Sequence, residues 1–237
     1  SVDGGETWNT IQEGLPKELG KMAISVAQSN PDKVYALIES DSEKEKGGLF
    51  VSNNACKSWS RISGDHRLIQ RAWYYTEVFA DPQNEHMVYV LSAPMLRSID
   101  GGKNWEVMGG THGDYHDLWI NPANPKNMVV SNDGGAAITF NRGDSRSRQD
   151  NMSTAQFYRV NVDNAFPDRV YGGQQDNTAV RIASRELNSG GIGFRSWDAS
   201  AGGESAFLAF DPDDARYVLG GSYLGTIEVL DTETKTS

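Results

Sequence analysis

The most informative segment of this chain is Ser98-Ile99-Asp100-Gly101-Gly102-Lys103-Asn104-Trp105. It follows a short apolar run and has the composition of a tight hairpin between two strands. The Ser and Asp oxygens can accept hydrogen bonds from backbone N–H groups, the glycines permit positive φ, and the Trp begins the return strand. One such hairpin says little about a fold, so its meaning depends on whether it recurs.

The pattern occurs three more times. A second full copy is Ser1-Val2-Asp3-Gly4-Gly5-Glu6-Thr7-Trp8. Two copies are eroded, because 52–59 has Cys56 at a glycine position and 139–146 lacks the Trp. The positions expected to hold the four hairpins together are Ser1, Asp3, Gly5, Trp8, Ser52, Asn54, Trp59, Ser98, Asp100, Gly102, Trp105, Thr139, Asn141 and Gly143. The recurrence indicates a repeat protein.

Five segments share a longer pattern: apolar strand, Asx/Pro turn, Val-Tyr-like strand, glycine-containing loop and strand. They span 22–51, 75–97, 115–140, 157–183 and 206–230, and their central strands recur every 40 to 54 residues. Four short strands in a unit of about 40–50 residues are typical of a β-propeller blade. We therefore predict an all-β fold, a β-propeller of four-stranded antiparallel blades without α-helices.

The repeat also predicts the domain organisation. The chain is expected to be one propeller region, 1–237, in which 1–21 supplies only an outer strand. The blades are expected at 22–72, 73–112, 113–154, 155–204 and 205–237. Five blades could close a ring if the outer strand after Trp8 completed the blade that ends at Leu230. The first hairpin has no strand before it, so we expect instead that these blades are part of a larger propeller and pack against its remaining blades.

Strand direction assigns each loop to a face. If the strands of a blade are named A to D from the centre outward, the A–B and C–D turns lie on one face and the B–C and D–A loops on the other. The Asx/Pro turns join A to B and the Ser-x-Asp hairpins join C to D. Both are expected to be structural, and any binding or catalytic residue is expected on the opposite rim.

Composition excludes some classes of partner. Lys and Arg number 22 against 32 Asp and Glu, a formal net charge of -10, which disfavours nucleic acid and anionic membrane surfaces. No apolar run approaches the roughly 20 residues of a membrane helix. The single cysteine, Cys56, excludes an internal disulfide framework. Nothing in the sequence predicts a cofactor.

The hairpins resemble the Asp-box (BNR) repeats of sialidases, family 74 xyloglucanases and the sortilin-type propeller. The stretches 113–119, 132–135, 156–158 and 172–177 resemble bacterial secreted proteins often grouped with the N-terminal domain of sortilin. This resemblance implies a propeller in a secreted or periplasmic protein. The arginine-bearing strand motif of sialidases and the Asp-Val-Gly-Gly-type catalytic loop of family 74 are not visible.

The segment 112–117 leads into an innermost strand. If it is extended, His112, Asp114 and His116 share one face, a spacing that could present two imidazoles and a carboxylate to a metal. Two other interpretations remain open. The three side chains could hydrogen-bond to neighbouring loops and fix the mouth of the propeller, or they could contact a ligand directly.

The rim loops carry five carboxylates: Asp114, Asp117, Asp133, Asp176 and Glu204. Two carboxylates across a sugar are what a glycosidase needs, so the catalytic candidates are Asp114, Asp133, Asp176 and Glu204. Asp-Gly and Asp-Asn are also ordinary turn formers. The ligand-binding candidates are His112, His116, Asp117, Asn132, Gln174, Gln175, Asn177 and Trp73. Trp73 could stack on a sugar, whereas Trp119 is expected to pack between blades.

Two functions fit these observations. The first is a binding or scaffolding propeller whose rim recognises a glycan or a peptide without covalent chemistry. The second is a xyloglucanase-like glycoside hydrolase that acts on a polysaccharide with paired carboxylates. The mixed-charge segment 39–46, which includes Asp41 and Glu43, is expected to be solvated.

Overall fold

The structure, a computed structural model, describes residues 1–40, 44–152 and 154–237, which form two compact units, 1–151 and 152–237. The predicted all-β class is confirmed: the described strands form five antiparallel sheets, and the only helices among them are four 3₁₀ turns of three residues each. In the described residues, no helix has the length and apolar character needed to cross a bilayer. Asp41 and Glu43 lie outside the described residues.

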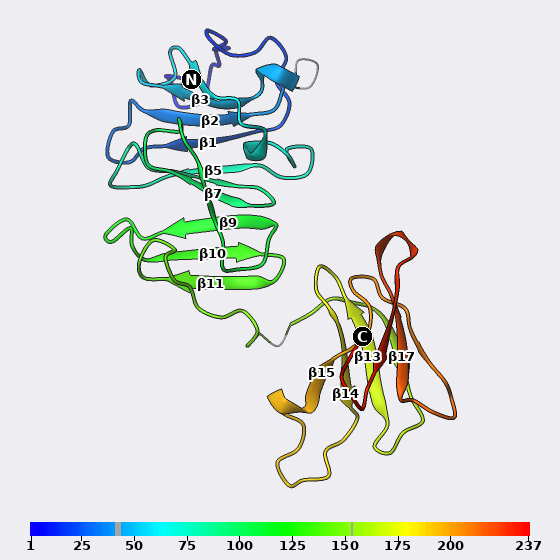
Figure 1. Cartoon of the computed structure of the whole chain (residues 1–237). Helices are drawn as coiled ribbons and strands as arrows, with labels where there is room; N and C mark the ends of the chain where they lie inside the picture. The colour runs from blue at the N-terminus through cyan, green and yellow to red at the C-terminus, as the bar shows by residue number, and fades with distance from the viewer. Residues whose placement is uncertain (41–43, 153) are drawn as a thin grey trace. The chain divides into compact units, whose positions relative to one another are not determined.

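The first unit contains three sheets that follow one another along the chain (Figure 1). In chain order their strands are β1 (Met22–Val26), β2 (Val34–Ile38), β3 (Gly48–Ser52) and β4 (Ser60–Ser63); β5 (Glu77–Ala80), β6 (Val88–Leu91), β7 (Met95–Ser98) and β8 (Glu106–Met108); and β9 (Tyr115–Ile120), β10 (Met128–Asn132) and β11 (Gly135–Thr139). Each strand pairs with its sequence neighbour, and the first strands of successive sheets, β1 with β5 and β5 with β9, adjoin. This is the meander of a propeller blade.

The second unit contains two more such sheets. The fourth sheet is β12 (Phe157–Val162), β13 (Arg169–Gln174), β14 (Ala179–Ala183) and β15 (Trp197–Ala199), and the fifth is β16 (Leu208–Phe210), β17 (Tyr217–Gly221) and β18 (Ile227–Asp231). The 3₁₀ turns are Lys44–Lys46, His66–Leu68, Phe194–Ser196 and Tyr223–Gly225.

Predicted outer strands are missing in three places, one of them the fifth sheet, which has three strands in the described residues. The described residues of the third sheet have three strands, because the polar stretch 142–150 makes only isolated bonds: Ser147 N donates to Ile138 O at 2.8 Å, and Ile138 N donates to Ser147 Oγ at 2.9 Å. Residues 1–21 contain no strand either. Instead, Trp59 N donates to Glu13 O at 2.9 Å, so this segment lies against the first sheet. Both segments are rich in polar and Gly/Pro residues, which disfavour strands.

The Asx/Pro turns and the C–D hairpins lie on the same face of each sheet, as strand direction predicts. In the second sheet, Gly101 N donates to His86 O at 2.7 Å, which ties the hairpin to the A–B turn. The corresponding bonds in the other sheets are Ala55 N to Asp32 O, Arg142 N to Lys126 O, Ser184 N to Asp168 O and Thr232 N to Arg216 O, at 2.8–3.0 Å. We call this surface the hairpin face and the opposite end of the sheets, made of D–A and B–C loops, the loop rim.

The hairpin of the second sheet is held by side-chain oxygens. Ser98 Oγ accepts from Gly102 N at 2.8 Å, and Asp100 Oδ1 accepts from Asn104 N at 2.9 Å. Trp105 Nε1 donates to Gly102 O at 3.0 Å. Hydrogen bonds from Asn104 lower the pKa of Asp100 to about 2.

The other copies repeat this network despite their changed residues. The backbone bonds from the fifth residue to the first hydroxyl are Gly5 N to Ser1 Oγ, Cys56 N to Ser52 Oγ and Gly143 N to Thr139 Oγ1, at 2.8–2.9 Å. Asn54 and Asn141 replace the aspartate and accept from Ser58 N and Ser145 N at 3.0 and 2.9 Å. Cys56 holds the left-handed conformation of the glycine it replaces, with φ 68°. The hairpin therefore requires a left-handed backbone at this position even where cysteine replaces glycine.

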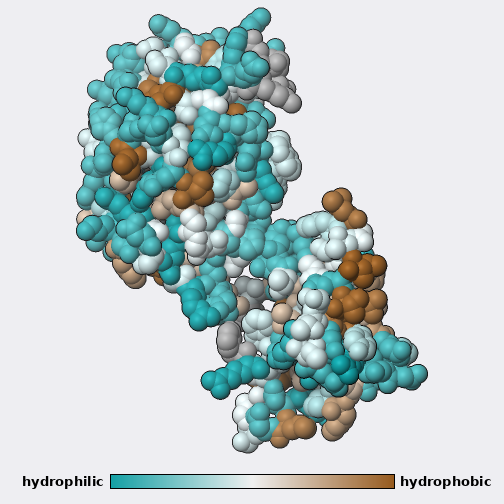
Figure 2. All heavy atoms as spheres, viewed as in Figure 1, coloured by the Kyte–Doolittle hydropathy of each residue, from teal (hydrophilic) through white to brown (hydrophobic). Residues whose placement is uncertain are grey.

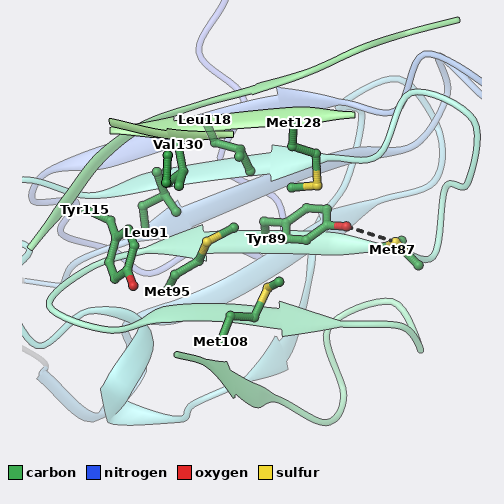
Figure 3. Close-up of a cluster of buried hydrophobic side chains, with 10 residues drawn as sticks. Met87, Tyr89, Leu91, Met95, Met108, Tyr115, Leu118, Met128 and Val130 are labelled. Carbon is green, nitrogen blue, oxygen red and sulfur yellow. Dashed lines mark hydrogen bonds between the residues drawn. The ribbon is translucent and has the colours of Figure 1, made fainter. Parts of the chain in front are cut away.

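The first unit is held together by packing between sheets. On β6, Val88 and Val90 pack toward the first sheet, while Tyr89 and Leu91 pack toward the third. Figure 3 shows the second of these clusters, in which Tyr89 and Leu91 meet side chains from β9 and β10. The core of the second unit is smaller and centres on Tyr171, Leu208 and Val218.

The second unit presents more apolar surface. Every residue of β12 is exposed, as are Leu224 in the turn after β17 and Ile227 in β18. Hydrophobic side chains gather along one edge of this unit in Figure 2. Trp119, which was predicted to pack between blades, is instead 54% exposed on β9.

Candidate functional site

The candidate site lies on the loop rim of the first unit. It is built from the D–A loop before β5, the D–A loop before β9, the first residues of β9 and the B–C loop after β10. These segments are far apart in sequence, but they meet because every D–A and B–C loop opens toward the same end of the sheets. These loops lie opposite the hairpin face.

Asp114 is the centre of the first half of the site. Tyr75, buried before β5, donates its hydroxyl to Asp114 Oδ1 at 2.8 Å, and Arg71 Nη1 lies 3.1 Å from the same oxygen. Burial, and then this bond, raise the pKa of Tyr75 above its usual value. Asp114 N donates to Ala93 O at 3.0 Å, which holds the carboxylate's backbone in place.

His116 and Asp133 form the second half. His116 Nε2 lies 2.7 Å from Asp133 Oδ1. The imidazole also contacts Tyr75, with ring centroids 4.8 Å apart, and Tyr74, with centroids 6.2 Å apart. Asp133 N donates to Asp114 O at 3.3 Å. The two halves therefore form one network of charged, phenolic and imidazole groups.

An exposed aromatic pair adjoins this network. Trp73 is 73% exposed, and its ring lies 5.7 Å from that of Tyr74 at an interplanar angle of 37°. Lys21 Nζ donates to the carbonyl oxygen of Tyr74 and fixes the backbone under the pair. Aromatic faces in such a position can stack on a ligand.

A second carboxylate pair lies on the inner strands β5 and β9. Burial, and then the negative charge of Asp117, raise the pKa of Glu77 above its usual value, while Lys21 acts in the opposite sense. Asp117 was a sequence candidate, but Glu77, Arg71 and Tyr75 were not. Glu77 opens a strand, and no local sequence pattern marks it.

His112 and Asn132 were ligand-binding candidates, and the bonds they make are within the loop rim. Asn132 is buried, its Nδ2 donates to His112 O at 2.9 Å, and its Oδ1 accepts from Gln149 Nε2 at 2.7 Å. Gln149 Oε1 accepts from His112 N at 3.0 Å. These bonds fix the B–C loop that carries Asp133. Gln149 comes from the polar stretch 142–150, which contains no strand.

The predicted metal geometry at His112, Asp114 and His116 is wrong. It required an extended segment, but Asp114 has a left-handed backbone, with φ 52°, so the side chains do not alternate as in a strand. His112 Nδ1 lies 3.1 Å from Gly113 O, while Asp114 and His116 have the partners given above. Across the described residues, no group of three or more His, Cys, Asp or Glu side chains could hold a metal ion.

The other rim candidates belong to the second unit, so the five predicted carboxylates are divided between the units. Gln174 Nε2 donates to Thr178 O at 2.7 Å, Gln175 N donates to Gln156 O at 2.8 Å, and Asn177 Nδ2 donates to Gln175 O at 3.1 Å. These residues shape the B–C loop around Asp176. Glu204 lies in the D–A loop before β16.

Comparisons with known proteins found matches among solved structures alone. No family model and no curated protein sequence matches the chain. Solved structures similar to it include YCF48 from Cyanidioschyzon merolae (TM-score 0.41, 16% identity, 93% of this chain and 75% of that one). Another is YCF48 bound to D1 peptide (0.43, 14%, 97% and 70%). A third is the GH74 xyloglucanase from Xanthomonas campestris (0.34, 14%, 87% and 36%). Similarity at these levels says nothing about what this chain binds.

Proposed function

We propose that this chain is a binding module whose loop rim recognises a glycan or a peptide without covalent chemistry. The observation that supports this most directly is the network of Asp114, Tyr75, Arg71, His116 and Asp133. Each carboxylate already has a protein partner, so the network is ordered before any ligand arrives. Ordered polar groups lose little conformational entropy on binding.

The neighbouring aromatic pair supports the same proposal. Trp73 and Tyr74 are exposed beside the ordered polar groups. A binding site for a sugar or an extended peptide needs an apolar platform together with fixed hydrogen-bonding groups. The resemblance of the hairpins to Asp-box repeats, and hence a secreted or periplasmic location and a sortilin-like relationship, remains part of this proposal.

A panel of oligosaccharides and extended peptides tests the proposal by calorimetric titration. Trp73→Ala removes the exposed ring and should lower the affinity for the ligand about tenfold, as expected at the centre of a binding surface. The matched control is Trp8→Ala, which removes an exposed Trp from the N-terminal hairpin 1–8, outside the loop rim, and should leave affinity unchanged. Equal losses in the two variants, or no loss in either, would contradict the proposal.

One observation favours the glycoside hydrolase as a second candidate. The raised pKa of Glu77 beside Asp117 is the property of a general acid paired with a second carboxylate. Incubation with β-glucans and xyloglucan, followed by assay of reducing ends, separates the two functions. Release of reducing ends that Glu77→Gln abolishes would establish the hydrolase and overturn the binding module.

A further inference from the structure

Glu204 in the second unit has two tyrosines around its carboxylate. Tyr158 of β12 donates its hydroxyl to Glu204 Oε1 at 3.4 Å. A hydrogen bond to Glu204, followed by burial and the nearby charge of Asp176, raises the pKa of Tyr223 to about 12. Both tyrosine rings are exposed. The group therefore opens to solvent on the loop rim of this unit.

Two hydrogen bonds hold the backbone immediately before Glu204. Gly202 N donates to Glu228 Oε2 at 2.7 Å, and Gly203 N donates to Gly221 O at 3.2 Å. Gly202 has φ 83°, and a Cβ there would lie 2.6 Å from Gly221 O, so no larger residue fits. The carboxylate is consequently presented from a fixed backbone.

Asp114 of the first unit is the repeat equivalent of Glu204. Each lies seven residues before the Asx-Pro pair of its A–B turn, Asn121-Pro122 and Asp211-Pro212. Each accepts a tyrosine hydroxyl from the inner end of the preceding sheet, Tyr75 for Asp114 and Tyr158 for Glu204. The repeat therefore builds the same tyrosine and carboxylate pair twice.

The two pairs differ in one component. Asp114 also binds a guanidinium group, that of Arg71, at 3.1 Å. Among the described residues, no lysine or arginine forms an ion pair with Glu204. Arg71 thus shows that a guanidinium group fits beside a tyrosine and carboxylate pair of this kind.

We propose that Glu204, Tyr158 and Tyr223 bind the guanidinium group of an arginine side chain in a peptide ligand. A guanidinium is planar, donates to a carboxylate through two N–H groups and stacks on aromatic rings. Glu204 supplies the carboxylate and the exposed phenol rings supply the faces. This inference rests on the proposed binding function and names the chemical group that one part of the rim takes.

The test titrates acetyl-Gly-Arg-Gly-amide into the ¹⁵N-labelled chain and follows amide signals of Gly203, Ser222 and Leu224. The reference peptide carries citrulline, which has the shape of arginine without its charge. Concentrations up to about 10 mM are needed, because contact with a single group gives affinities in the millimolar range. The arginine peptide should shift these signals saturably and bind at least fivefold more tightly than the citrulline peptide, since the charge-assisted bond is lost with citrulline.

Two variants locate the contact. Glu204→Gln should weaken arginine binding at least about fivefold, because it removes the charge and keeps the shape. The control is Asp213→Asn, which removes the same charge from the A–B turn on the hairpin face and should leave binding unchanged. If Glu204→Gln unfolds, as thermal melting would show, Tyr223→Ala takes its place and should also weaken binding, because it removes one of the two aromatic faces.

Equal binding of the two peptides, no saturable shift, or full binding by the folded Glu204→Gln variant would overturn the inference. Those results would not contradict the proposed function if Trp73→Ala still weakened binding of the ligand found in the panel, because Trp73 belongs to the other unit. If Trp73→Ala left the affinity for the panel ligand unchanged while the arginine peptide still bound, only the proposed site in the first unit would be overturned.

Discussion

The Ser98 hydroxyl makes two of the hydrogen bonds that hold its hairpin. It is buried, and its Oγ accepts from Gly102 N while donating to Asp100 Oδ1 at 2.8 Å. Ser98→Ala leaves a buried N–H group without its acceptor, so the free energy of unfolding should fall by about 1–2 kcal/mol. Urea denaturation measures this change in the free energy of unfolding. Ser1→Ala removes the same bonds from an exposed hairpin and should change stability little, since water replaces the lost acceptor. Similar losses in both variants would contradict this account.

At the level of residues, local chemistry was predictable and long-range partners were not. The Ser and Asp bonds of the hairpins follow from turn chemistry within eight residues. The partners of Asp114 come from a loop about 40 residues away, and Tyr75 and Arg71 carry no local pattern that marks them. The metal prediction failed because alternation along a strand was assumed at Asp114, where the backbone is left-handed.

Among the elements, β6 contributes to two of the hydrophobic clusters of the first unit, because its two faces meet different sheets. Leu91→Ala should lower the free energy of unfolding by about 2–4 kcal/mol, since it leaves a cavity between the second and third sheets. Val107→Ala on the outer strand β8 is the control, and it should cost at most about 0.5 kcal/mol because that side chain is exposed. A small loss for Leu91→Ala would mean that the sheets do not pack as described.

The elements were predicted well where apolar residues are concentrated. The second strand of each sheet has an apolar or glycine-containing segment bounded by turn residues, which the sequence displays in β2, β6, β10, β13 and β17. The missing outer strands occur where this signal is absent: 142–150 is polar, and 1–21 contains Gly and Pro and bonds to Trp59 through Glu13. Repeat symmetry alone predicted strands there, but side chains without an apolar face cannot stabilise one.

In every sheet, the alternating strand direction places the hairpins and Asx/Pro turns at one end and the candidate binding residues at the other. The hairpins and Asx/Pro turns bond to each other at one end of every sheet. The charged and aromatic groups of the first unit gather at the other end, and the Glu204 group occupies the equivalent position in the second unit. The blade boundaries remain predictions.

The most direct test of this division is hydrogen–deuterium exchange of the chain with and without the ligand found in the panel. Bound ligand should slow exchange in 71–76, 112–117 and 131–134, because these segments form the loop rim of the first unit. Exchange in the hairpins 98–105 and 139–146 should stay the same. Protection confined to the hairpins, with the rim segments unchanged, would contradict the account.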